Sequence, residues 1–417
     1  MSVQDPEAAM AEPAAVGVGR DEPVYFNGEV WPVCKMVFKF TLLTIITLGI
    51  YRFWAKTRLR QYFWSQTEFD GDRFEYLGTP KELFIGFLIV MAILAPVFFA
   101  AEFIGTLVAS NGVVPTIIYQ FCYLLTFLVL IQVAIYRMSR YRLTRTSWRG
   151  VRFGLDGNAW HFCFMALVAM ATIIGSIGIA YPWMRNWLIR YRVENMRFGD
   201  SYFHYSGQAS MLRNRWWIGL AVCVSPFVVA AIVSGIPDLA EIENFFSQLE
   251  AEGKVAGDDV PAAFAAYSIA YGVAVLAAIV MYIWYRVGEY RAVVSHISLG
   301  EATMDSSLST ARIFGLVGMM VGLFVLLFAC TVGAFVVIQG PGAASSGGIV
   351  AFIFVFVAFF IGFSVIPTGI YGTLMTRAVL TSLRVYNKQS LTDIAQGDQS
   401  KMKYGEGLAD AFDVGAF

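Results

Sequence analysis

Residues 83–107 read LFIGFLIVMAILAPVFFAAEFIGTL and contain one charged side chain, Glu102. A helix needs about 20 apolar residues to cross roughly 30 Å of hydrocarbon, so this run is long enough to span a bilayer. Five further runs have the same character. We therefore predict six membrane-spanning helices, over Leu83–Leu107, Thr116–Tyr136, Trp216–Ser234, Ala262–Tyr285, Phe314–Ile338 and Ile349–Thr373.

The composition supports a membrane protein. Of the 417 residues, 58% are hydrophobic and 14% are charged, whereas about a quarter are charged in an ordinary soluble domain. A soluble enzyme is therefore excluded. Because the formal net charge is zero, we expect no nucleic-acid partner.

The distribution of basic residues predicts the orientation. Short cytoplasmic loops collect Lys and Arg, whereas external loops do not. Loops 108–115 and 339–348 contain neither, and loop 235–261 has only Lys254 against seven acidic residues, so we place these three in the periplasm. Both termini are then cytoplasmic. The basic residues gather in Arg52–Lys81, Arg137–Arg152, Arg185–Arg215, Arg286–Arg312 and Arg377–Lys403.

Two more apolar segments, Pro32–Trp54 and Trp160–Trp183, affect the number of membrane crossings and hence the compartment in which the neighbouring loops lie. If Trp160–Trp183 crossed the membrane once, the basic clusters on its two sides would face opposite compartments. We therefore predict that both segments enter and return on one face, with turns near Gly49 and Gly178. The alternative is eight full spans in two inverted halves, as in many transporters.

The sequence also repeats itself. A shift of 129 positions aligns Phe26–Gly78 with Leu155–Gly207 without a gap. A pair of large apolar residues five positions apart recurs at the end of each unit. The aligned identities include Gly28/Gly157, Trp31/Trp160, Gly49/Gly178, Trp54/Trp183, Tyr62/Tyr191, Phe69/Phe198, Phe74/Phe203 and Gly78/Gly207, and the apolar pairs are Phe69/Phe74, Trp148/Phe153, Phe198/Phe203 and Leu299/Met304.

The sequence of each repeat unit predicts a helix, a tight β-hairpin and a short link to the next span. Phe69–Phe74 supplies an Asp-Gly turn between alternating residues, which is typical of a hairpin. Val24–Gly28 resembles a closing strand, and the last unit, Tyr371–Lys388, lacks a recognisable hairpin. We expect four hairpins and one added strand to form a small β layer at the cytoplasmic face.

The predicted fold class is thus a mainly α membrane protein, a polytopic bundle with internal duplication, six full spans, two re-entrant or interfacial apolar segments and small cytoplasmic β-hairpins. We divide the chain into a disordered N-terminal tail (1–23), a first repeat half (24–152), a second repeat half (153–304), a final helical pair (305–386) and a C-terminal tail (387–417).

Residues 42–58, LLTIITLGIYRFWAKTR, followed by Phe69–Tyr76, FDGDRFEY, resemble the YjgN family of bacterial inner-membrane proteins, a domain of unknown function. The resemblance covers nearly the whole chain. It implies a polytopic protein of the bacterial inner membrane and supplies no catalytic residues.

Signatures of enzymes are absent. His161, His204 and His296 lie in separate segments, and no HExxH, nucleophile elbow or phosphate-binding loop occurs. We therefore expect no enzymatic activity, no metal site and no cofactor.

Basic and aromatic residues at the cytoplasmic ends of the helices form the candidate site. They can bind anionic lipid headgroups of the inner leaflet, or they can anchor the helices at the interface in the ordinary way. A non-enzymatic scaffold or lipid-interacting protein is the favoured function, and a permease or channel with its site between the broken segments is the alternative. Protein partners stay unknown. The interface candidates are Arg58, Tyr62, Arg137, Tyr141, Arg185, Arg190, Tyr191, Arg286 and Tyr290, and the turn candidates are Gly49 and Gly178.

Overall fold

The computed structural model describes residues 21–238, 240–244, 247, 262–338, 346–392 and 394–396. Most of the N-terminal tail, of the acidic loop 235–261 and of the C-terminal tail lies outside the described residues. What was predicted for those three segments therefore stays a prediction, as do the boundaries of the repeat halves.

Six helices are long and apolar enough to cross a membrane, which confirms the six predicted spans within the described part of the chain. Most continue beyond the predicted runs at the end that carries basic residues. The spans are α3 (Pro80–Ala109), α4 (Val113–Thr144), α7 (Ser210–Ser234), α9 (Ala262–Val294), α10 (Thr310–Ile338) and α11 (Ser346–Ser364), the last continuing through the π-helix η2 (Val365–Tyr371) into α12 (Gly372–Leu380).

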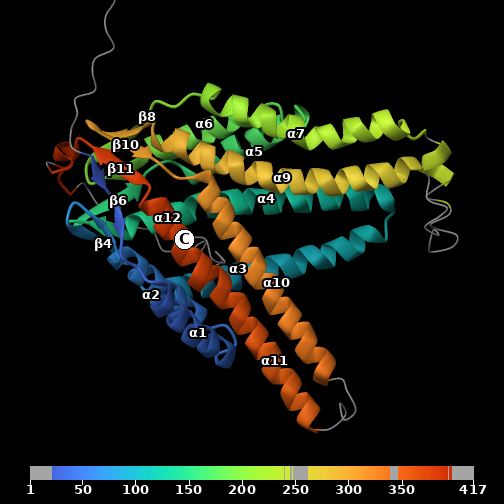
Figure 1. Ribbon diagram of the computed structural model, residues 1–417, viewed down its shortest axis with the longest axis horizontal. Coiled ribbons are helices and arrows are strands. Elements are labelled where there is room, and N and C mark those ends of the chain that lie inside the picture. Colours follow the sequence, from blue (N-terminus) through green and yellow to red (C-terminus); the bar gives the residue numbers. More distant parts are fainter. Residues whose placement is uncertain are drawn as a thin grey trace, which may run out of the picture.

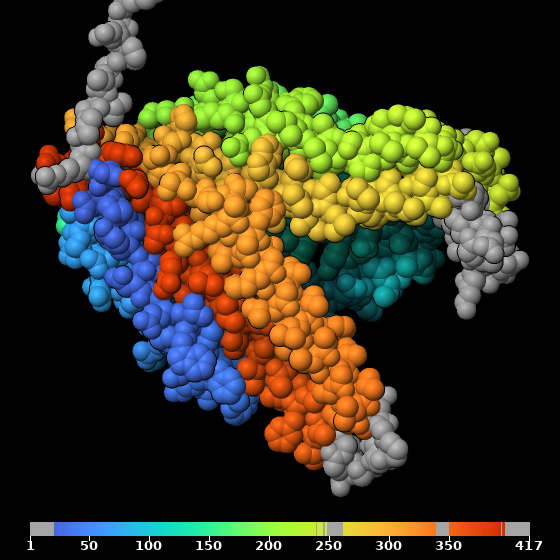
Figure 2. Space-filling view, viewed as in Figure 1, coloured from blue at the N-terminus to red at the C-terminus, as the bar shows by residue number. Residues whose placement is uncertain are grey.

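The spans pack as pairs. α3 lies against α4, α7 against α9, and α10 against α11. The α10–α11 pair diverges from the α7–α9 pair with increasing distance from the strands, so the long helices splay apart (Figures 1 and 2). The strands gather at the end where all three pairs converge (Figure 1).

The two shorter apolar segments fold back on themselves. α1 (Val30–Ile46) is followed by a turn and by α2 (Arg52–Ser65), and α5 (Ala159–Gly175) is followed by a turn and by α6 (Tyr181–Glu194). In each turn a non-glycine residue and the following glycine have positive φ: Leu48 at 50° with Gly49 at 92°, and Ile177 at 50° with Gly178 at 82°. Only glycine adopts such angles without strain, so these glycines fix the reversals.

Both folded-back segments start and end at the same sheet. Strand β2 (Tyr25–Phe26) precedes α1 and pairs with β3 (Thr67–Phe69), which follows α2. Likewise β6 (Val151–Leu155) precedes α5 and pairs with β7 (Met196–Phe198), which follows α6. At about 25 Å, α1 and α5 are also shorter than the hydrocarbon core. This arrangement is the predicted return on one face and not eight separate spans.

Four β-hairpins form where the sequence predicts them. In the first, Asp70 and Gly71 have φ values of 51° and 79°, the two positive angles of a type I′ turn. Phe69 therefore pairs with Asp72 across the turn. The hairpins are β3–β4 (Asp72–Tyr76), β5 (Thr146–Trp148)–β6, β7–β8 (Ser201–Tyr205) and β9 (Ile297–Leu299)–β10 (Ala302–Ser306).

The hairpins form a larger sheet than the small β layer that was expected. All strands join one antiparallel sheet in the order β1-β11-β10-β9-β8-β7-β6-β5-β4-β3-β2. β1 (Glu22–Pro23) and β2 are separated only by Val24, whose backbone N–H donates to the Leu383 carbonyl at 3.2 Å. The same short segment thus borders both ends of the ladder, and the sheet closes into a near-barrel.

The sheet is larger than expected because the last unit, which lacks a hairpin as predicted, contributes one strand, β11 (Leu383–Tyr386). β11 pairs with β10 on one side and with β1 on the other. β11 thereby fills the position between β10 and β1, which leaves no unpaired edge there.

We predict that cysteine pairs form disulfides across both seams of the barrel in a variant without native cysteines. Pro23 is the partner of Arg384 across β1–β11, and Tyr25 is the partner of Glu68 across β2–β3. Paired residues in antiparallel strands lie within disulfide reach. After mild oxidation, mass spectrometry of peptides should detect both cross-links.

The control is Glu68→Cys with Arg384→Cys, two strand spacings apart or about 10 Å, which is too far to bridge. Efficient bridging in this control, or in only one seam, would contradict a closed sheet.

Candidate functional site

The barrel encloses an apolar cavity of about 650 Å³. Its lining includes every one of the large apolar residues that recur five positions apart. A two-residue turn makes Phe69 the partner of Asp72, and Phe74 lies two positions farther, on the same face as Asp72. Both members of each pair therefore point inward. The eight are Phe69, Phe74, Trp148, Phe153, Phe198, Phe203, Leu299 and Met304.

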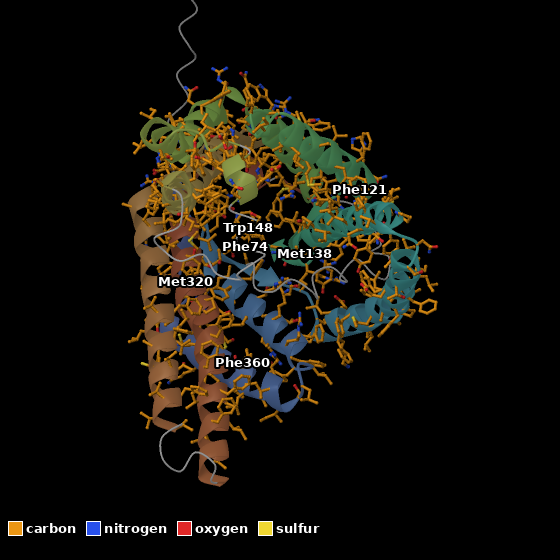
Figure 3. The ribbon with its side chains drawn as sticks, turned by 90° about the vertical axis from the view of Figure 1, so that its right-hand side faces the viewer. Phe74, Phe121, Met138, Trp148, Met320 and Phe360 are labelled. Carbon is orange, nitrogen blue, oxygen red and sulfur yellow. The ribbon has the colours of Figure 1, made fainter. Side chains whose placement is uncertain are left out.

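Aromatic rings form a continuous wall around part of this cavity. The ring centroids of Phe69 and Trp148 are 5.2 Å apart, those of Trp148 and Phe198 are 5.8 Å apart, and those of Phe198 and Phe153 are 4.7 Å apart. Figure 3 shows Phe74 and Trp148 side by side in the interior, far from Phe360 on α11. Such contacts between tilted rings are favourable, so the wall keeps its shape.

The cavity extends to the end of the last span. Its lining continues from the strands to Trp64 at the end of α2 and to Pro367, Tyr371 and Met375 of η2 and α12. Trp64 Nε1 donates to Thr146 Oγ1 at 2.9 Å, which fixes the indole beside the sheet. The π-helix at Val365–Tyr371 is a rare conformation that often accompanies functional sites.

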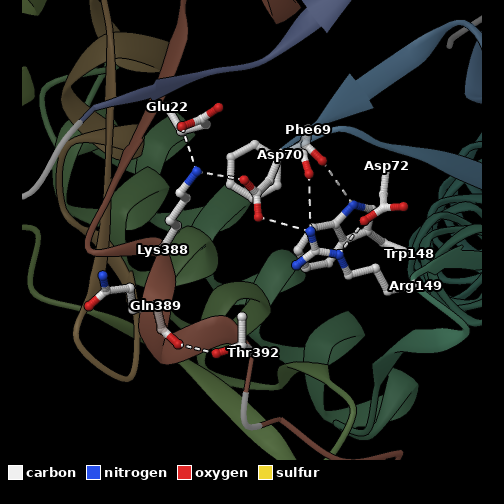
Figure 4. Close-up of polar contacts among 9 residues, drawn as sticks. All are labelled: Glu22, Phe69, Asp70, Asp72, Trp148, Arg149, Lys388, Gln389 and Thr392. Carbon is white, nitrogen blue, oxygen red and sulfur yellow. Dashed lines mark hydrogen bonds and ion pairs between the residues drawn. The ribbon is translucent and has the colours of Figure 1, made fainter.

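The opposite end of the barrel carries a polar network that we call the C-terminal seal: Glu22, Asp70, Arg149 and Lys388 (Figure 4). Lys388 Nζ contacts Glu22 Oε2 at 2.7 Å and Asp70 Oδ1 at 2.5 Å. Arg149 Nη2 contacts Asp70 Oδ2 at 2.9 Å. Leu391, three residues after Lys388, is buried and lines the cavity, so the chain beyond β11 covers this end.

These contacts shift the titration of the groups involved. The hydrogen bond from Lys388 lowers the pKa of Asp70, and the contact with Arg149 lowers it further. The carboxylate of Asp70 in turn raises the pKa of Lys388. Asp70 and Lys388 are therefore both ionised at neutral pH.

The structure brings two of the nine interface candidates together. Arg185 of α6 and Arg286 of α9 both pair with Glu289 of α9, with Arg185 Nε 2.6 Å from Oε1 of the carboxylate. The side chain of Glu289 is only 4% exposed. These two arginines thus bind a buried carboxylate of the protein itself, which the sequence reasoning missed because Glu289 lies within a basic cluster.

Three candidate tyrosines hydrogen-bond within the protein. Tyr62 Oη accepts the backbone N–H of Glu29 at 3.3 Å, and Tyr191 Oη accepts that of Asn158 at 2.8 Å. Tyr141 is buried and donates to Glu82 Oε2 at 3.1 Å. These hydroxyls connect α2 and α6 to the starts of α1 and α5, and α4 to α3.

The remaining candidates are spread over several helices. Arg58 and Arg190 are exposed, and Arg137 and Tyr290 are partly buried. Arg190 donates to the Gly207 carbonyl at 3.0 Å.

The two turns lie in different surroundings. The Gly178 carbonyl accepts a hydrogen bond from Trp216 Nε1 at 2.9 Å, whereas no atom would lie within 4 Å of a Cβ added to Gly49. α1 packs against η2 and α11, and α5 packs against α4. Among the described residues, no group of His, Cys, Asp and Glu is arranged to hold a metal ion.

We predict that Asp70→Asn loosens the C-terminal seal and speeds tryptic cleavage after Lys388 about two- to fivefold at pH 7. The substitution removes a carboxylate that contacts both Lys388 and Arg149. Because the pKa of Asp70 is lowered on folding, its contribution is complete above the ordinary value of about 4 and is lost as pH falls through the lowered pKa. The cleavage rate is measured by mass spectrometry of the released peptide.

Asp72→Asn is the matched control, because Asp72 contacts Arg149 but leaves the pairing of Lys388 intact. Equal cleavage rates in the two variants would show that Asp70 does not hold the segment.

Comparisons with known proteins agree with the predicted resemblance. A family model for bacterial proteins of unknown function (DUF898) matches residues 21–411. Inner membrane protein YjgN of Escherichia coli O157:H7 and that of strain K12 are each 31% identical over 139 residues, which cover 33% of this chain and 32% of the relative. The match thus spans about a third of the length of these curated relatives. No solved structure matches the chain. The chain therefore belongs to the DUF898 family of bacterial proteins of unknown function, to which its signature residues pointed.

Proposed function

We propose that this protein is a multi-pass inner-membrane protein that binds the hydrocarbon chain of a lipid, or of a similar amphipathic molecule, inside its barrel. The observation that carries the proposal is the apolar cavity of about 650 Å³ that continues to the end of the last span. The binding is non-enzymatic in this proposal, which specifies the lipid-interacting function favoured by the sequence.

The size of the cavity supports a ligand. Protein interiors are close-packed, with few voids larger than a water molecule, and ligand pockets occupy about 300–1,000 Å³. Ring contacts such as Phe153–Phe198 show that the wall itself is well packed, so the space is not a result of loose side chains. A cavity lined by apolar groups excludes water and favours apolar occupants.

The geometry of the two ends favours entry from the helices. One end has the charged network of Asp70, Arg149 and Lys388, where a hydrocarbon chain would displace ion pairs. The other end is lined by Pro367 and Met375, at the junction between the last span and the sheet. A chain that enters there passes from the bilayer to the barrel along apolar side chains.

The orientation follows from the basic residues, which lie on helix ends and strands next to the barrel. Because Lys and Arg concentrate on the cytoplasmic side of membrane proteins, we place the barrel and both termini in the cytoplasm. The turn at Asn111, between α3 and α4, then faces the periplasm.

The permease alternative rested on a site between Gly49 and Gly178. The different surroundings of the two turns give that site no support, so we do not propose it. The acidic loop that a scaffold would use for partners lies mostly outside the described residues.

We predict that Met304→Trp lowers the amount of lipid that co-purifies with the protein severalfold. Met304 lines the cavity, and an indole at this position occupies space that a hydrocarbon chain needs. The lipid is extracted from protein purified in a mild detergent and quantified by mass spectrometry.

Thr303→Trp is the matched control, because Thr303 precedes Met304 on the same strand and its side chain is exposed. Equal lipid retention in both variants, or a wild-type protein with an empty barrel, would overturn the proposal.

A second prediction concerns the orientation. In a variant without native cysteines, Arg58→Cys and Arg291→Cys should react with an impermeant thiol reagent only after the inner membrane is opened. Asn111→Cys should react in intact spheroplasts. All three side chains are exposed, so access depends on the compartment. Labelling of Arg58→Cys and Arg291→Cys from opposite sides would contradict the proposed topology.

A further inference from the structure

Arg192, in the last turn of α6, is a charged side chain without a charged partner. Its guanidinium lies 5.3 Å from the ring centroid of Phe162 on α5. Its Nε atom is buried and has no hydrogen-bond partner, and no carboxylate of the described residues forms an ion pair with it. A buried guanidinium nitrogen in this state is costly, because burial removes its hydration without compensation.

The surroundings of Arg192 are positive. Burial lowers its pKa, and the charges of Arg185 and Arg142 lower it further. Arg185 is already paired with Glu289. The local field therefore attracts an anion and has no nearby acidic side chain to provide one.

A second polar group at the same junction also lacks a partner. Tyr136 of α4 is fully buried, and its hydroxyl makes no hydrogen bond. Its ring centroid is 5.0 Å from that of Phe162, so Tyr136 and Arg192 pack on the same ring. Tyr136 and Arg192 thus both contact Phe162 where α4, α5 and α6 join.

The fold does not need a charge at this position. In the ungapped alignment of the two segments, the residue that corresponds to Arg192 is Phe63 of α2. Phe63 is 2% exposed and stacks on Phe26 with a centroid distance of 5.8 Å. The first helical pair, α1 and α2, therefore accommodates a large apolar side chain at the position where the second pair, α5 and α6, has an arginine.

We propose that Arg192 is the centre of a binding site for a phosphate-bearing anion between α4, α5 and α6. The planar guanidinium offers two parallel N–H donors to a phosphate. The anion is the phosphate of a lipid headgroup or a free phosphate. Arg192 and Tyr136 are not part of the cavity lining, so this site is independent of the function proposed above.

The test uses the full-length protein in discs of phosphatidylcholine, into which phosphatidylglycerol is titrated in one arm and inorganic phosphate in the other. The thermal midpoint of unfolding is measured at each concentration. Wild type should show a saturable rise in one arm, and that arm identifies the source of the phosphate. Arg192→Phe, which introduces the residue of the first helical pair, should bind about 10- to 100-fold more weakly.

Arg73→Gln is the control, because Arg73 is an exposed arginine of strand β4 and is not one of the interface candidates. Its titration should match that of wild type. If Arg192→Phe does not fold, Arg192→Gln takes its place with the same expected loss. The proposal is overturned if wild type responds in neither arm, or if the Arg192 variant binds as tightly as wild type.

Discussion

The closed ladder of backbone hydrogen bonds is the constraint on which the other features depend. Each hairpin lies between two helical segments, so a single ring of strands ties the ends of all the described helices to one place. The spans pack as pairs, but the α10–α11 pair diverges from the α7–α9 pair away from the strands in Figure 1, so the bundle alone does not define the fold. The ring also determines which residues face inward, and hence the shape and the apolar character of the cavity.

Much of this architecture can be predicted from local patterns. Long apolar runs give the spans, and the positive φ values at Asp70 and Gly71 follow from the preference of an Asp-Gly pair for a type I′ turn. The reversal at Gly178 follows from the basic clusters on both sides of the apolar segment Trp160–Trp183, because both clusters are expected to face the same compartment. Each of these features depends on residues close in sequence, where the physical signal is complete within one segment.

The remaining features depend on distant residues. β11 has no turn sequence of its own, and its pairing with Pro23 joins segments from opposite ends of the chain. The five-residue spacing of Trp148 and Phe153 predicts that both side chains lie on one face of the sheet. It does not predict the cavity that this face borders. The burial of Glu289 and the missing partner of Arg192 are properties of helix junctions, and a basic cluster looks the same in sequence whether its charges are paired or not.

The pairing of β1 with β11 has a consequence for biosynthesis. Within the ring, all strands pair with neighbours in chain order except where β1 meets β11, across more than 360 residues. While a ribosome is still producing the middle of the protein, the N-terminal segment Glu22–Phe26 has a partner on one side only. The nascent chain must therefore keep this edge from aggregating until the final strand emerges. Truncation shortly before Leu383 would remove β11 from the ring. Its neighbours β1 and β10 would then have unpaired edges that promote aggregation.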